Sequence, residues 1–267
     1  MYIPFFKYHA QGNDFVLIDD RLLNLCKNIA IDKLCQNMCH RHFGIGANGL
    51  ILLAHHDNFN FEMLFYNPDG SLSMCGNGAR CAVHLAQKLN IISYQAQFIH
   101  QNKLYHAHID TKKNIHLIVQ GNPVIVKESQ GYIVHNGAKH YITFTENLSN
   151  FSLYSGYYDI VKRGILHHNF NAVQYINKNH IKLRTYENGV FAETLSCGTG
   201  AIAAALVSAQ KYSTKSPTLV STPGGQLTVT YHKQSTTNAI TYDNIVLIGN
   251  VSFLFEGKYL YTPSTDV

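Results

Sequence analysis

One short pattern of residues occurs twice in the chain, and it is of a kind that supports acid–base chemistry. The pattern Cys-Gly-x-Gly-Ala stands at residues 75–79 and again at residues 197–201. A run of small and apolar residues at helical spacing follows each copy, which predicts a helix beginning close to each cysteine. A helix N-terminus carries about half a positive charge, and this lowers the pKa of a cysteine placed there. Cys75 and Cys197 are therefore candidate proton carriers.

The glycines of both copies open these helix ends to a ligand. They remove side chains that would block the backbone N–H groups, and the same groups bind carboxylates. Two such ends facing each other would hold one carboxylate with a sulfur on either side. That arrangement suits removing a proton from one face of a carbon atom while delivering one to the other. A single copy is explained as well by close packing, but the repetition favours the catalytic interpretation.

The elements around the motifs predict two similar α+β halves. The central helices are expected from about residue 75 to 90 and from residue 197 to about 211, the second apolar on nearly every face and so deeply buried. A further helix is predicted over residues 29–39 with Asn28 as its N-cap, and residues 67–70 are predicted to form a turn. Strands are predicted at residues 5–9, 15–19, 50–54, 61–66, 97–100, 103–110, 114–120, 181–186, 218–221, 226–231 and 245–248.

Length and composition fit this organisation and exclude several classes of protein. The 267 residues suffice for one large or two ordinary domains, and 46% hydrophobic against 14% charged residues exclude a disordered or coiled-coil protein. The net charge of +5 is scattered, without the Lys/Arg cluster of a nucleic-acid-binding surface. Apolar runs are too short to span a bilayer, and the N-terminus shows no secretory signal. We therefore expect a cytoplasmic protein with reduced cysteines and with neither a nucleic-acid nor a membrane partner.

The remaining cysteines have simpler interpretations. Cys26 and Cys81 are expected to be small core residues. Residues 35–40 hold two cysteines and a histidine, but their spacing fits no standard finger and no second ligand pair accompanies them, so no metal site is predicted. The glycine-rich residues 44–49 precede a strand rather than open a helix, which is the wrong context for dinucleotide binding.

On these motifs the chain resembles the diaminopimelate epimerases, a family of amino-acid epimerases that work without pyridoxal phosphate. The resemblance runs nearly end to end. Its most specific segments are the two cysteine motifs within residues 74–81 and 193–201, and further matching segments are residues 7–15, 44–50, 67–70 and 222–227. The resemblance implies an α+β fold of two pseudo-symmetric domains, each a curved, mostly antiparallel sheet wrapped around a central helix.

The resemblance also implies where the domains divide. Residues 1–122 together with 252–267 would form the N-terminal domain that carries Cys75, because the family's final strand, here residues 252–261, returns to the first domain. Residues 123–251 would form the C-terminal domain that carries Cys197. A homodimer without cofactor or metal is expected, acting on a small amino-acid substrate.

The implied reaction interconverts LL- and meso-diaminopimelate on the route to lysine and peptidoglycan precursors. In the LL-to-meso direction Cys197 would accept the α-proton and Cys75 would donate one, while His140 and Glu187 match residues that tune the pKa values of the two cysteines. Backbone N–H groups at both helix starts would hold the reacting carboxylate. The implied substrate-binding residues are Asn13, Asn67, Gly76, Asn77, Asn171, Glu187, Asn188, Gly198 and Thr199.

Two departures from the family pattern bear on the substrate. The family has an arginine after the glutamate, where this chain has Asn188, and that arginine grips the distal carboxylate of diaminopimelate. A neutral asparagine lacks this charge-assisted, two-point contact. The family also has Asn-Pro-His where residues 138–140 read Ala-Lys-His, so Lys139 is a candidate for the missing cation.

Two alternatives stay open at this stage. The first is a racemase or epimerase of the same class that acts on an amino acid without a distal carboxylate. The second, from a different class, is a thiol-redox or zinc-binding module that uses its cysteines structurally. The repeat and the helix-start glycines favour the enzyme, because a redox module normally places two cysteines close together in the sequence.

Overall fold

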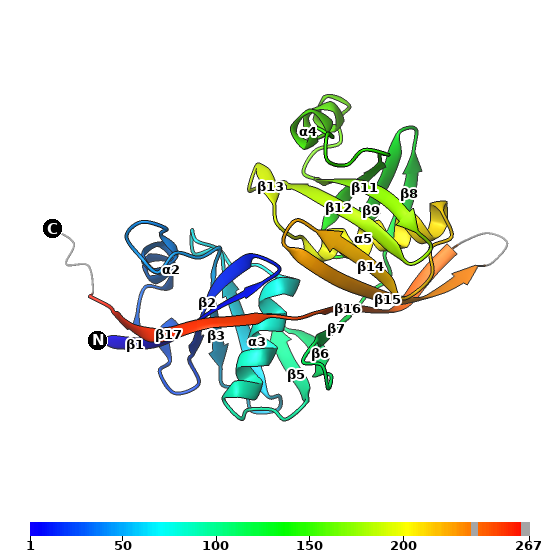
Figure 1. Cartoon of the computed structure of the whole chain (residues 1–267). Helices are drawn as coiled ribbons and strands as arrows, with labels where there is room; N and C mark the ends of the chain where they lie inside the picture. The colour runs from blue at the N-terminus through cyan, green and yellow to red at the C-terminus, as the bar shows by residue number, and fades with distance from the viewer. Residues whose placement is uncertain (236–239, 263–267) are drawn as a thin grey trace. The chain divides into compact units, whose positions relative to one another are not determined.

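The chain divides into two compact units in the computed structural model, which describes residues 1–235 and 240–262 (Figure 1). Unit 1 is Met1–Leu117 with Asn250–Val267, and unit 2 is Ile118–Gly249. The units thus divide a few residues before the boundaries expected after residues 122 and 251. Among the described residues, no helix is both long and apolar enough to cross a membrane.

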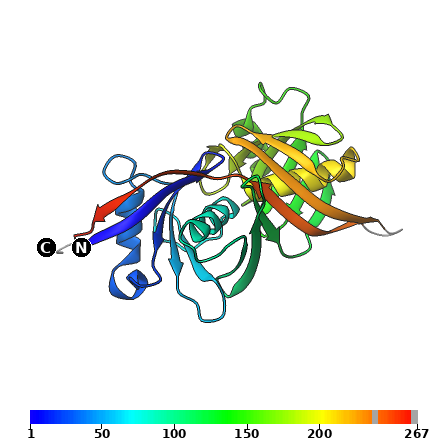
Figure 2. The same ribbon diagram turned by 60° about the horizontal axis from the view of Figure 1, so that its bottom comes forward.

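Unit 1 is a mixed sheet around the central helix α3 (Gly76–Lys88), which the strands enclose in Figures 1 and 2. The pairs β17–β1, β1–β2, β3–β4 and β5–β6 are antiparallel, and β2–β3 and β4–β5 are parallel. The short helices α1 (Leu25–Asn28) and α2 (Ile31–Cys39) add a second apolar cluster against β2 and β3. The strands are β1 (Tyr2–Ala10), β2 (Asn13–Asp19), β3 (Leu50–Ala54), β4 (Phe61–Tyr66), β5 (Gln95–His100), β6 (Lys103–Ile109), β7 (Ile115–Val119) and β17 (Ser252–Leu260).

Unit 2 is a second mixed sheet around helix α5 (Gly198–Lys211), whose residues are almost all buried, as its apolar sequence predicts. Helix α4 (Leu153–Lys162) packs on β11 and β12. The strands are β8 (Val124–Glu128), β9 (Gly131–His135), β10 (Lys139–Phe144), β11 (Asn169–Asn177), β12 (His180–Glu187), β13 (Ala192–Thr194), β14 (Thr218–Thr222), β15 (Gly225–Ser235) and β16 (Ile240–Gly249).

The order of strand pairing is the same in both units. In unit 2 the pairs β8–β9, β9–β10, β11–β12 and β14–β15 are antiparallel, and β10–β11 and β12–β14 are parallel. Strand β17, from the end of the chain, therefore occupies in unit 1 the place that β8 has in unit 2. The predicted α+β fold, with a mostly antiparallel sheet around one helix in each half, is confirmed.

One predicted helix is wrong at its start. Asn28 is not an N-cap but the last residue of α1, and α2 begins at Ile31 after Ala30. The helix breaks because Ile29 is extended and its N–H bonds back to the Leu25 carbonyl at 3.0 Å, closing a separate turn. Strands β8 to β11 and helix α4 were not predicted.

Candidate active site

Both motif cysteines are the N-cap residues of the central helices. Cys75 and Cys197 have extended backbones, with φ/ψ of −134°/117° and −115°/114°. The first helical hydrogen bonds run from Ala79 N–H to the Cys75 carbonyl at 2.8 Å and from Ala201 N–H to the Cys197 carbonyl at 2.9 Å. The N–H groups of the first turn therefore point out of each helix end. They include those of Gly76, Asn77, Gly198 and Thr199.

The second glycine of each motif lets its helix approach the sheet closely. A Cβ atom at Gly78 would lie 2.9 Å from Ile51 Cδ1, and one at Gly200 would lie 2.6 Å from Asn171 Oδ1. At Gly200 a larger residue would press on the fixed amide of Asn171, whereas at Gly78 the flexible end of Ile51 would have to move. These glycines fix the position of the cysteine relative to the strand residues beneath it.

The sulfur of Cys75 receives an amide N–H from the start of β2. Asn13 Nδ2 lies 3.7 Å from Cys75 Sγ, and Asn13 Oδ1 accepts a hydrogen bond from Asn48 Nδ2 at 2.9 Å. Because Asn48 occupies the oxygen, the nitrogen of Asn13 is the end directed at the sulfur. An N–H donor favours the thiolate over the thiol.

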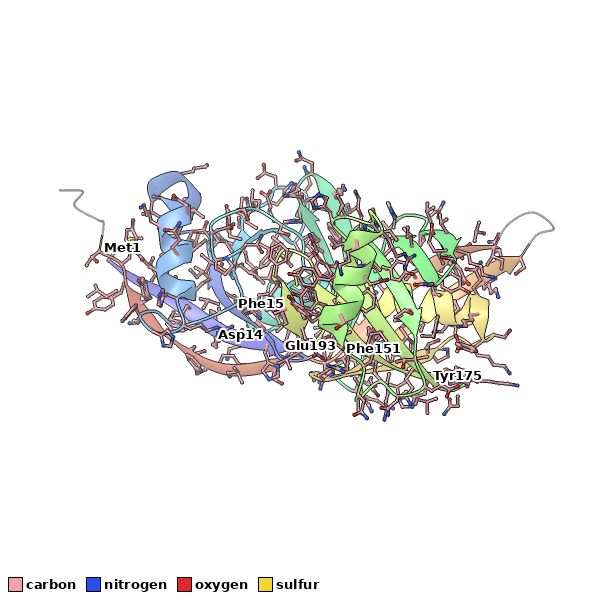
Figure 3. The ribbon with its side chains drawn as sticks, turned by 90° about the horizontal axis from the view of Figure 1, so that it is seen from above. Met1, Asp14, Phe15, Phe151, Tyr175 and Glu193 are labelled. Carbon is pink, nitrogen blue, oxygen red and sulfur yellow. The ribbon has the colours of Figure 1, made fainter. Side chains whose placement is uncertain are left out.

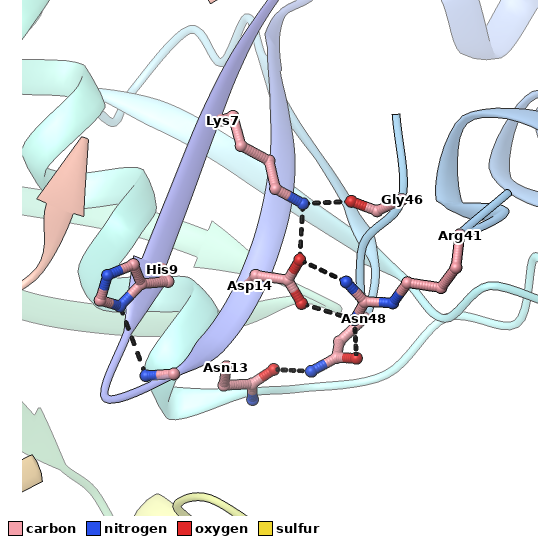
Figure 4. A network of polar contacts seen from close by, with 8 residues as sticks. Lys7, His9, Asn13, Asp14, Arg41, Gly46 and Asn48 are labelled. Atoms are coloured by element: carbon pink, nitrogen blue, oxygen red, sulfur yellow. Dashed lines mark hydrogen bonds and ion pairs between the residues drawn. The ribbon is translucent and has the colours of Figure 1, made fainter. Parts of the chain in front are cut away.

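A charged network holds Asn13 and Asn48 in place (Figure 4). Arg41 donates to Asn48 Oδ1 at 2.6 Å and to both carboxylate oxygens of Asp14 at 2.7 and 2.8 Å. The buried Lys7 ammonium donates to Asp14 and to the Gly46 carbonyl. Burial alone would raise the pKa of Asp14, but the hydrogen bonds and charges of Arg41 and Lys7 bring it below the ordinary value. The network ties the glycine-rich loop to β2.

Cys197 has an acidic neighbour instead. Its side chain is buried and hydrogen-bonded to that of Glu187, which ends β12, and Thr199 Oγ1 lies 3.5 Å from its sulfur. Glu187 also accepts a hydrogen bond from Thr194 Oγ1 at 2.7 Å. Burial raises the pKa of Glu187, and the bonds from Thr194 and Cys197 offset part of that rise. A carboxylate of raised pKa can exchange a proton with the thiol beside it.

His140 and Asn171 form a buried polar pair on β10 and β11. Asn171 Nδ2 lies 3.1 Å from His140 Nδ1 and also donates to the Tyr141 and Asn169 carbonyls, at 3.2 and 3.0 Å. Asn171 Oδ1 accepts from Thr185 Oγ1 at 2.9 Å, which confirms the orientation of the amide. An amide nitrogen only donates, so this contact makes Nδ1 of His140 an acceptor and places the imidazole proton on Nε2, while the two amide hydrogens are shared among three acceptors.

The imidazole of His140 is neutral at pH 7. Burial above all, together with the charges of His168 and His135, lowers its pKa to about 3. Nε2 is buried, and no hydrogen-bond partner for it occurs in the described part of the chain. The side-chain amide of Asn171, predicted to contact substrate, is hydrogen-bonded to protein groups and fixes the tautomer of His140.

Asn188 is bound from two sides. Tyr157 Oη donates to Asn188 Oδ1 at 3.0 Å, and the backbone N–H of Asn188 donates to Asn169 Oδ1 at 2.9 Å. Lys139, the candidate replacement cation, is exposed on β10, and its charge acts on His168.

Asn67 follows β4 directly, as predicted, in the turn before the first cysteine motif. The Gly70 N–H donates to the Asn67 carbonyl at 2.9 Å, and Asn67 Nδ2 donates to Ser71 Oγ at 3.0 Å. Gly70 has a φ of +87°, which favours glycine there.

The other cysteines pack as small apolar residues. Cys81 is fully buried in α3, and Cys39 is buried under α2, where burial raises its pKa to about 12. Cys35 lies in the same cluster as Cys39, while the side chain of Cys26 lies outside the described residues. No cluster of three His, Cys, Asp or Glu side chains that could share a metal ion occurs in the described ranges.

Within each unit, the predicted residues gather around one helix start. Unit 1 brings together Asn13, Cys75, Gly76 and Asn77, and unit 2 brings together Asn171, His140, Glu187, Cys197 and Thr199. The sequence argument missed the residues behind them. Arg41 precedes the glycine-rich residues 44–49 that it had set aside for dinucleotide binding, and Asn48 belongs to them, while Thr185 and Thr194 carry no local signal at all.

Solved structures share this fold. A phenazine biosynthesis protein of the PhzF family from Bacillus anthracis superposes with a TM-score of 0.74 at 14% identity, covering 98% of this chain and all of that one. A hydroxyproline epimerase from Agrobacterium vitis, with bound trans-4-hydroxy-L-proline, has a TM-score of 0.66 at 12% identity and covers 96% of this chain and 92% of its own.

Sequence relatives are much closer. A diaminopimelate epimerase from Flavobacterium psychrophilum is 39% identical over 94% of this chain and 98% of its own length. One from Aquifex aeolicus is 34% identical over 96% and 97%. With these relatives, the two-unit fold and its paired helix-start cysteines define an isomerase, an amino-acid epimerase. The diaminopimelate epimerase family model matches residues 5–125 and 132–254, and the chain belongs to that family.

Proposed function

We propose that this enzyme interconverts LL- and meso-diaminopimelate by proton transfer at the α-carbon, with Cys75 and Cys197 as the two proton carriers and no cofactor. The observation that carries the proposal is the repeated helix start. In each unit a cysteine caps a glycine-opened helix in a chain that belongs to this epimerase family. Each end offers a sulfur and a set of N–H donors, which are the groups that a carboxylate-bearing carbon acid requires.

The proposed reaction moves one proton in and one proton out. In the LL-to-meso direction the Cys197 thiolate takes the α-proton and becomes a thiol. The N–H groups of the helix starts stabilise the negative charge that develops on the substrate's α-carboxylate. The Cys75 thiol then gives its proton to the opposite face of the carbon and becomes a thiolate.

Each sulfur has a neighbour suited to this exchange. Glu187, hydrogen-bonded to Cys197, accepts and returns the thiol proton between turnovers. Asn13 donates its amide N–H toward Cys75 and stabilises the thiolate left at the end of the step. His140, neutral with its proton on Nε2, acts as a fixed hydrogen-bond donor.

We further propose that the enzyme acts as a cytoplasmic homodimer in the synthesis of lysine and peptidoglycan precursors. The family supports the pathway. An exposed apolar run on β17 supports the dimer, because Phe253, Leu254 and Phe255 are 36%, 49% and 47% exposed. Light scattering on a size-exclusion column tests the dimer. A monomer at micromolar concentration would contradict it.

Incubating the enzyme with LL-diaminopimelate in deuterated water tests the reaction directly. We expect meso product with one deuterium at the inverted α-carbon, an NMR signal that Cys75→Ala and Cys197→Ala both lack. Cys81→Ala is the matched control, because this third cysteine lies in the interior of α3 and should leave exchange intact. Exchange that required added pyridoxal phosphate or zinc would overturn the two-cysteine assignment.

A second candidate function has one observation in its favour. Asn188, with its carbonyl oxygen held by Tyr157, offers a neutral amide where the family has an arginine. A racemase or epimerase acting on an amino acid without a distal carboxylate would need no cation there. The neutral contact would weaken diaminopimelate binding without touching the chemistry at the α-carbon.

The variant Asn188→Arg separates the two candidates. If diaminopimelate is the substrate, its KM should fall about tenfold with kcat nearly unchanged, because the new contact exists in ground and transition states alike. Lys139→Ala should raise the same KM if that lysine supplies the charge. Tyr157→Phe is the control, since it removes the hydroxyl that holds Asn188 and adds no charge. Loss of activity in Asn188→Arg, with the parent turning over a monocarboxylic amino acid, would establish the second function instead.

A further inference from the structure

Arg80 is the largest fully buried side chain among the residues that the structure describes, and its hydrogen-bond acceptors are neutral groups. Its Nη2 donates to Gln11 Oε1 at 2.5 Å and to Asn77 Oδ1 at 2.9 Å, and its Nη1 donates to the Gly76 carbonyl at 3.4 Å. Nε is buried without a hydrogen-bond partner. In the described part of the chain, no carboxylate lies within ion-pair distance of the guanidinium.

This side chain is nevertheless a cation. Burial lowers the pKa of Arg80 only to about 10, so the guanidinium keeps its charge at neutral pH. A buried charge without a partner is costly, and proteins normally pair it or remove it. Arg80 is nevertheless buried as a cation, so we expect a nearby group to carry the compensating negative charge.

Two sulfurs lie close to Arg80 on the same helix. Cys81 is not the counter-charge, because burial raises its pKa and keeps it a thiol. Cys75 caps the helix, and the carbonyl that Arg80 contacts belongs to the next residue, Gly76. Both thiols act on the guanidinium, Cys81 more than Cys75, and each raises its pKa against the effect of burial.

We propose that Arg80 is a positioning residue for the reaction: a permanent buried cation, held by Gln11 and Asn77, that stabilises the thiolate of Cys75. The inference rests on the role of Cys75 in the proposed function. The helix N-terminus and the Asn13 amide act on the same sulfur in the same direction. The helix N-terminus, the Asn13 amide and the Arg80 guanidinium thus all stabilise a negative charge on the sulfur of Cys75. Of these three groups, Arg80 carries a full positive charge.

A purely structural role makes a different prediction. Arg80 joins Gln11, in the turn after β1, to the first residues of α3, and this link alone would explain its hydrogen bonds. A clamp depends on the geometry of the guanidinium, whereas stabilisation of the thiolate depends on its charge. The two roles separate in variants that keep one property and lose the other.

The experiment measures how fast iodoacetamide alkylates each cysteine between pH 5 and 10, under reducing conditions and peptide by peptide in a mass spectrometer. In Arg80→Gln the midpoint of the Cys75 profile should rise by about one pH unit, a roughly tenfold slower reaction at neutral pH. Arg80→Lys keeps the charge and should keep the wild-type profile. The Cys197 profile, read from the same samples, should not move in either variant.

Further variants separate a structural role of Arg80 from an effect of its charge. Gln11→Met removes one partner of the guanidinium without touching its charge, so it should lower the melting temperature and leave the Cys75 profile in place. If Arg80→Gln does not fold, Arg80→Met is the second neutral variant, and its Cys75 midpoint should rise by the same amount; an unchanged midpoint in folded Arg80→Met overturns the inference equally. An unchanged profile in folded Arg80→Gln overturns the inference. Alkylation needs no substrate, so failure of the proposed reaction would appear separately, as absent turnover.

Discussion

The two units place different chemistry on the same backbone positions. In unit 1 Val16 pairs with Leu50 and Leu50 with Tyr66, and in unit 2 Tyr141 pairs with Phe170 and Phe170 with Tyr186. When the two units are aligned on these strand pairs, the residues beneath the two helix starts occupy equivalent positions. Phe15 and Ile51 of unit 1 match His140 and Asn171 of unit 2, and Gly78 matches Gly200.

Unit 1 therefore fills this position with an apolar pair and unit 2 with a polar one. Phe15 and Ile51 belong to the core around α3 and only pack. Figure 3 labels Phe15 beside Asp14, whose carboxylate joins the polar network of Lys7 and Arg41. His140 and Asn171 are as deeply buried, yet they must be desolvated and hydrogen-bonded. Unit 1 shows that apolar side chains at these two positions are compatible with the fold. Packing alone therefore does not explain the polar pair His140 and Asn171 in unit 2.

The two sulfurs differ in the same way. Cys75 meets an amide N–H and lies near a buried cation, whereas Cys197 meets a carboxylate. These neighbours favour a thiolate at Cys75 and a thiol at Cys197 in the enzyme without substrate. A two-base reaction requires that one sulfur be charged and the other protonated. The state that these neighbours favour is the one from which the meso-to-LL direction starts. In the LL-to-meso direction Glu187 must first take the proton of Cys197, and Cys75 must regain one.

The largest effect should come from removing either sulfur. Cys75→Ala and Cys197→Ala should each lower kcat/KM for epimerisation by about 10³-fold or more, because each proton transfer loses its carrier. Cys81→Ala should keep full turnover and lose about 1–2 kcal/mol of stability through its cavity. The assay is isomer conversion followed by chiral chromatography. Near-normal turnover in one alanine variant would mean that one unit alone carries the chemistry.

A smaller loss should follow from changing the carboxylate beside Cys197. Glu187→Gln removes the group that exchanges the thiol proton, so kcat should fall about tenfold to a hundredfold. The lost negative charge should also move the alkylation profile of Cys197 to lower pH and leave that of Cys75 in place. Glu193→Gln is the control, since this exposed carboxylate pairs with Arg184. A shift of both profiles would show that the two sites are not independent.

The paired glycines should respond unequally to alanine. A methyl group at Gly78 meets the flexible end of Ile51, and the gain in helix propensity of about 1 kcal/mol should nearly offset the contact. At Gly200 the methyl group meets the fixed amide oxygen of Asn171, so we expect a loss of about 1–3 kcal/mol. Urea denaturation of both variants measures the difference. Equal stability would contradict a rigid polar pair beneath α5.

The last effect appears only on acidification and concerns the pH dependence of stability. The pKa of His140 is about 3 in the folded chain, against about 6.5 in an unfolded chain. The unfolded chain therefore binds more protons below pH 6.5. Stability should fall as the pH drops toward 3, by about 1.4 kcal/mol per pH unit from this residue.

The double variant His140→Phe with Asn171→Ile, which copies the unit 1 pair into unit 2, should remove this contribution. Urea unfolding at pH 4, 5 and 6 measures the slope. The exposed His42→Gln serves as the control, and an unchanged slope in the double variant would contradict a buried neutral histidine.

Much of the site was open to prediction because its strongest signals are local. A cysteine followed by Gly-x-Gly at a helix start reports backbone geometry directly, and its repetition revealed the duplicated fold. The strands of unit 1 were found because they alternate and end at turns. Strands β8 to β11 were missed although Asn136 and Gly137 form a turn signal between β9 and β10, and α4 was missed although Ser152 caps it.

The sequence by itself determined the two helix starts and their cysteines, because propensity, capping and spacing act within a few residues, whereas the acidic and histidine candidates came from the resemblance to the family. Only the tertiary structure decided how those groups are tuned. The contact of Asn13 with Cys75 spans 62 residues, and that of Arg80 with Gln11 spans 69. Burial lowers the pKa of both His140 and Arg80. At neutral pH the first is left uncharged, whereas the second stays a cation because its pKa falls only to about 10. Desolvation and pairing depend on what surrounds a side chain in space, and no local pattern of residues encodes that.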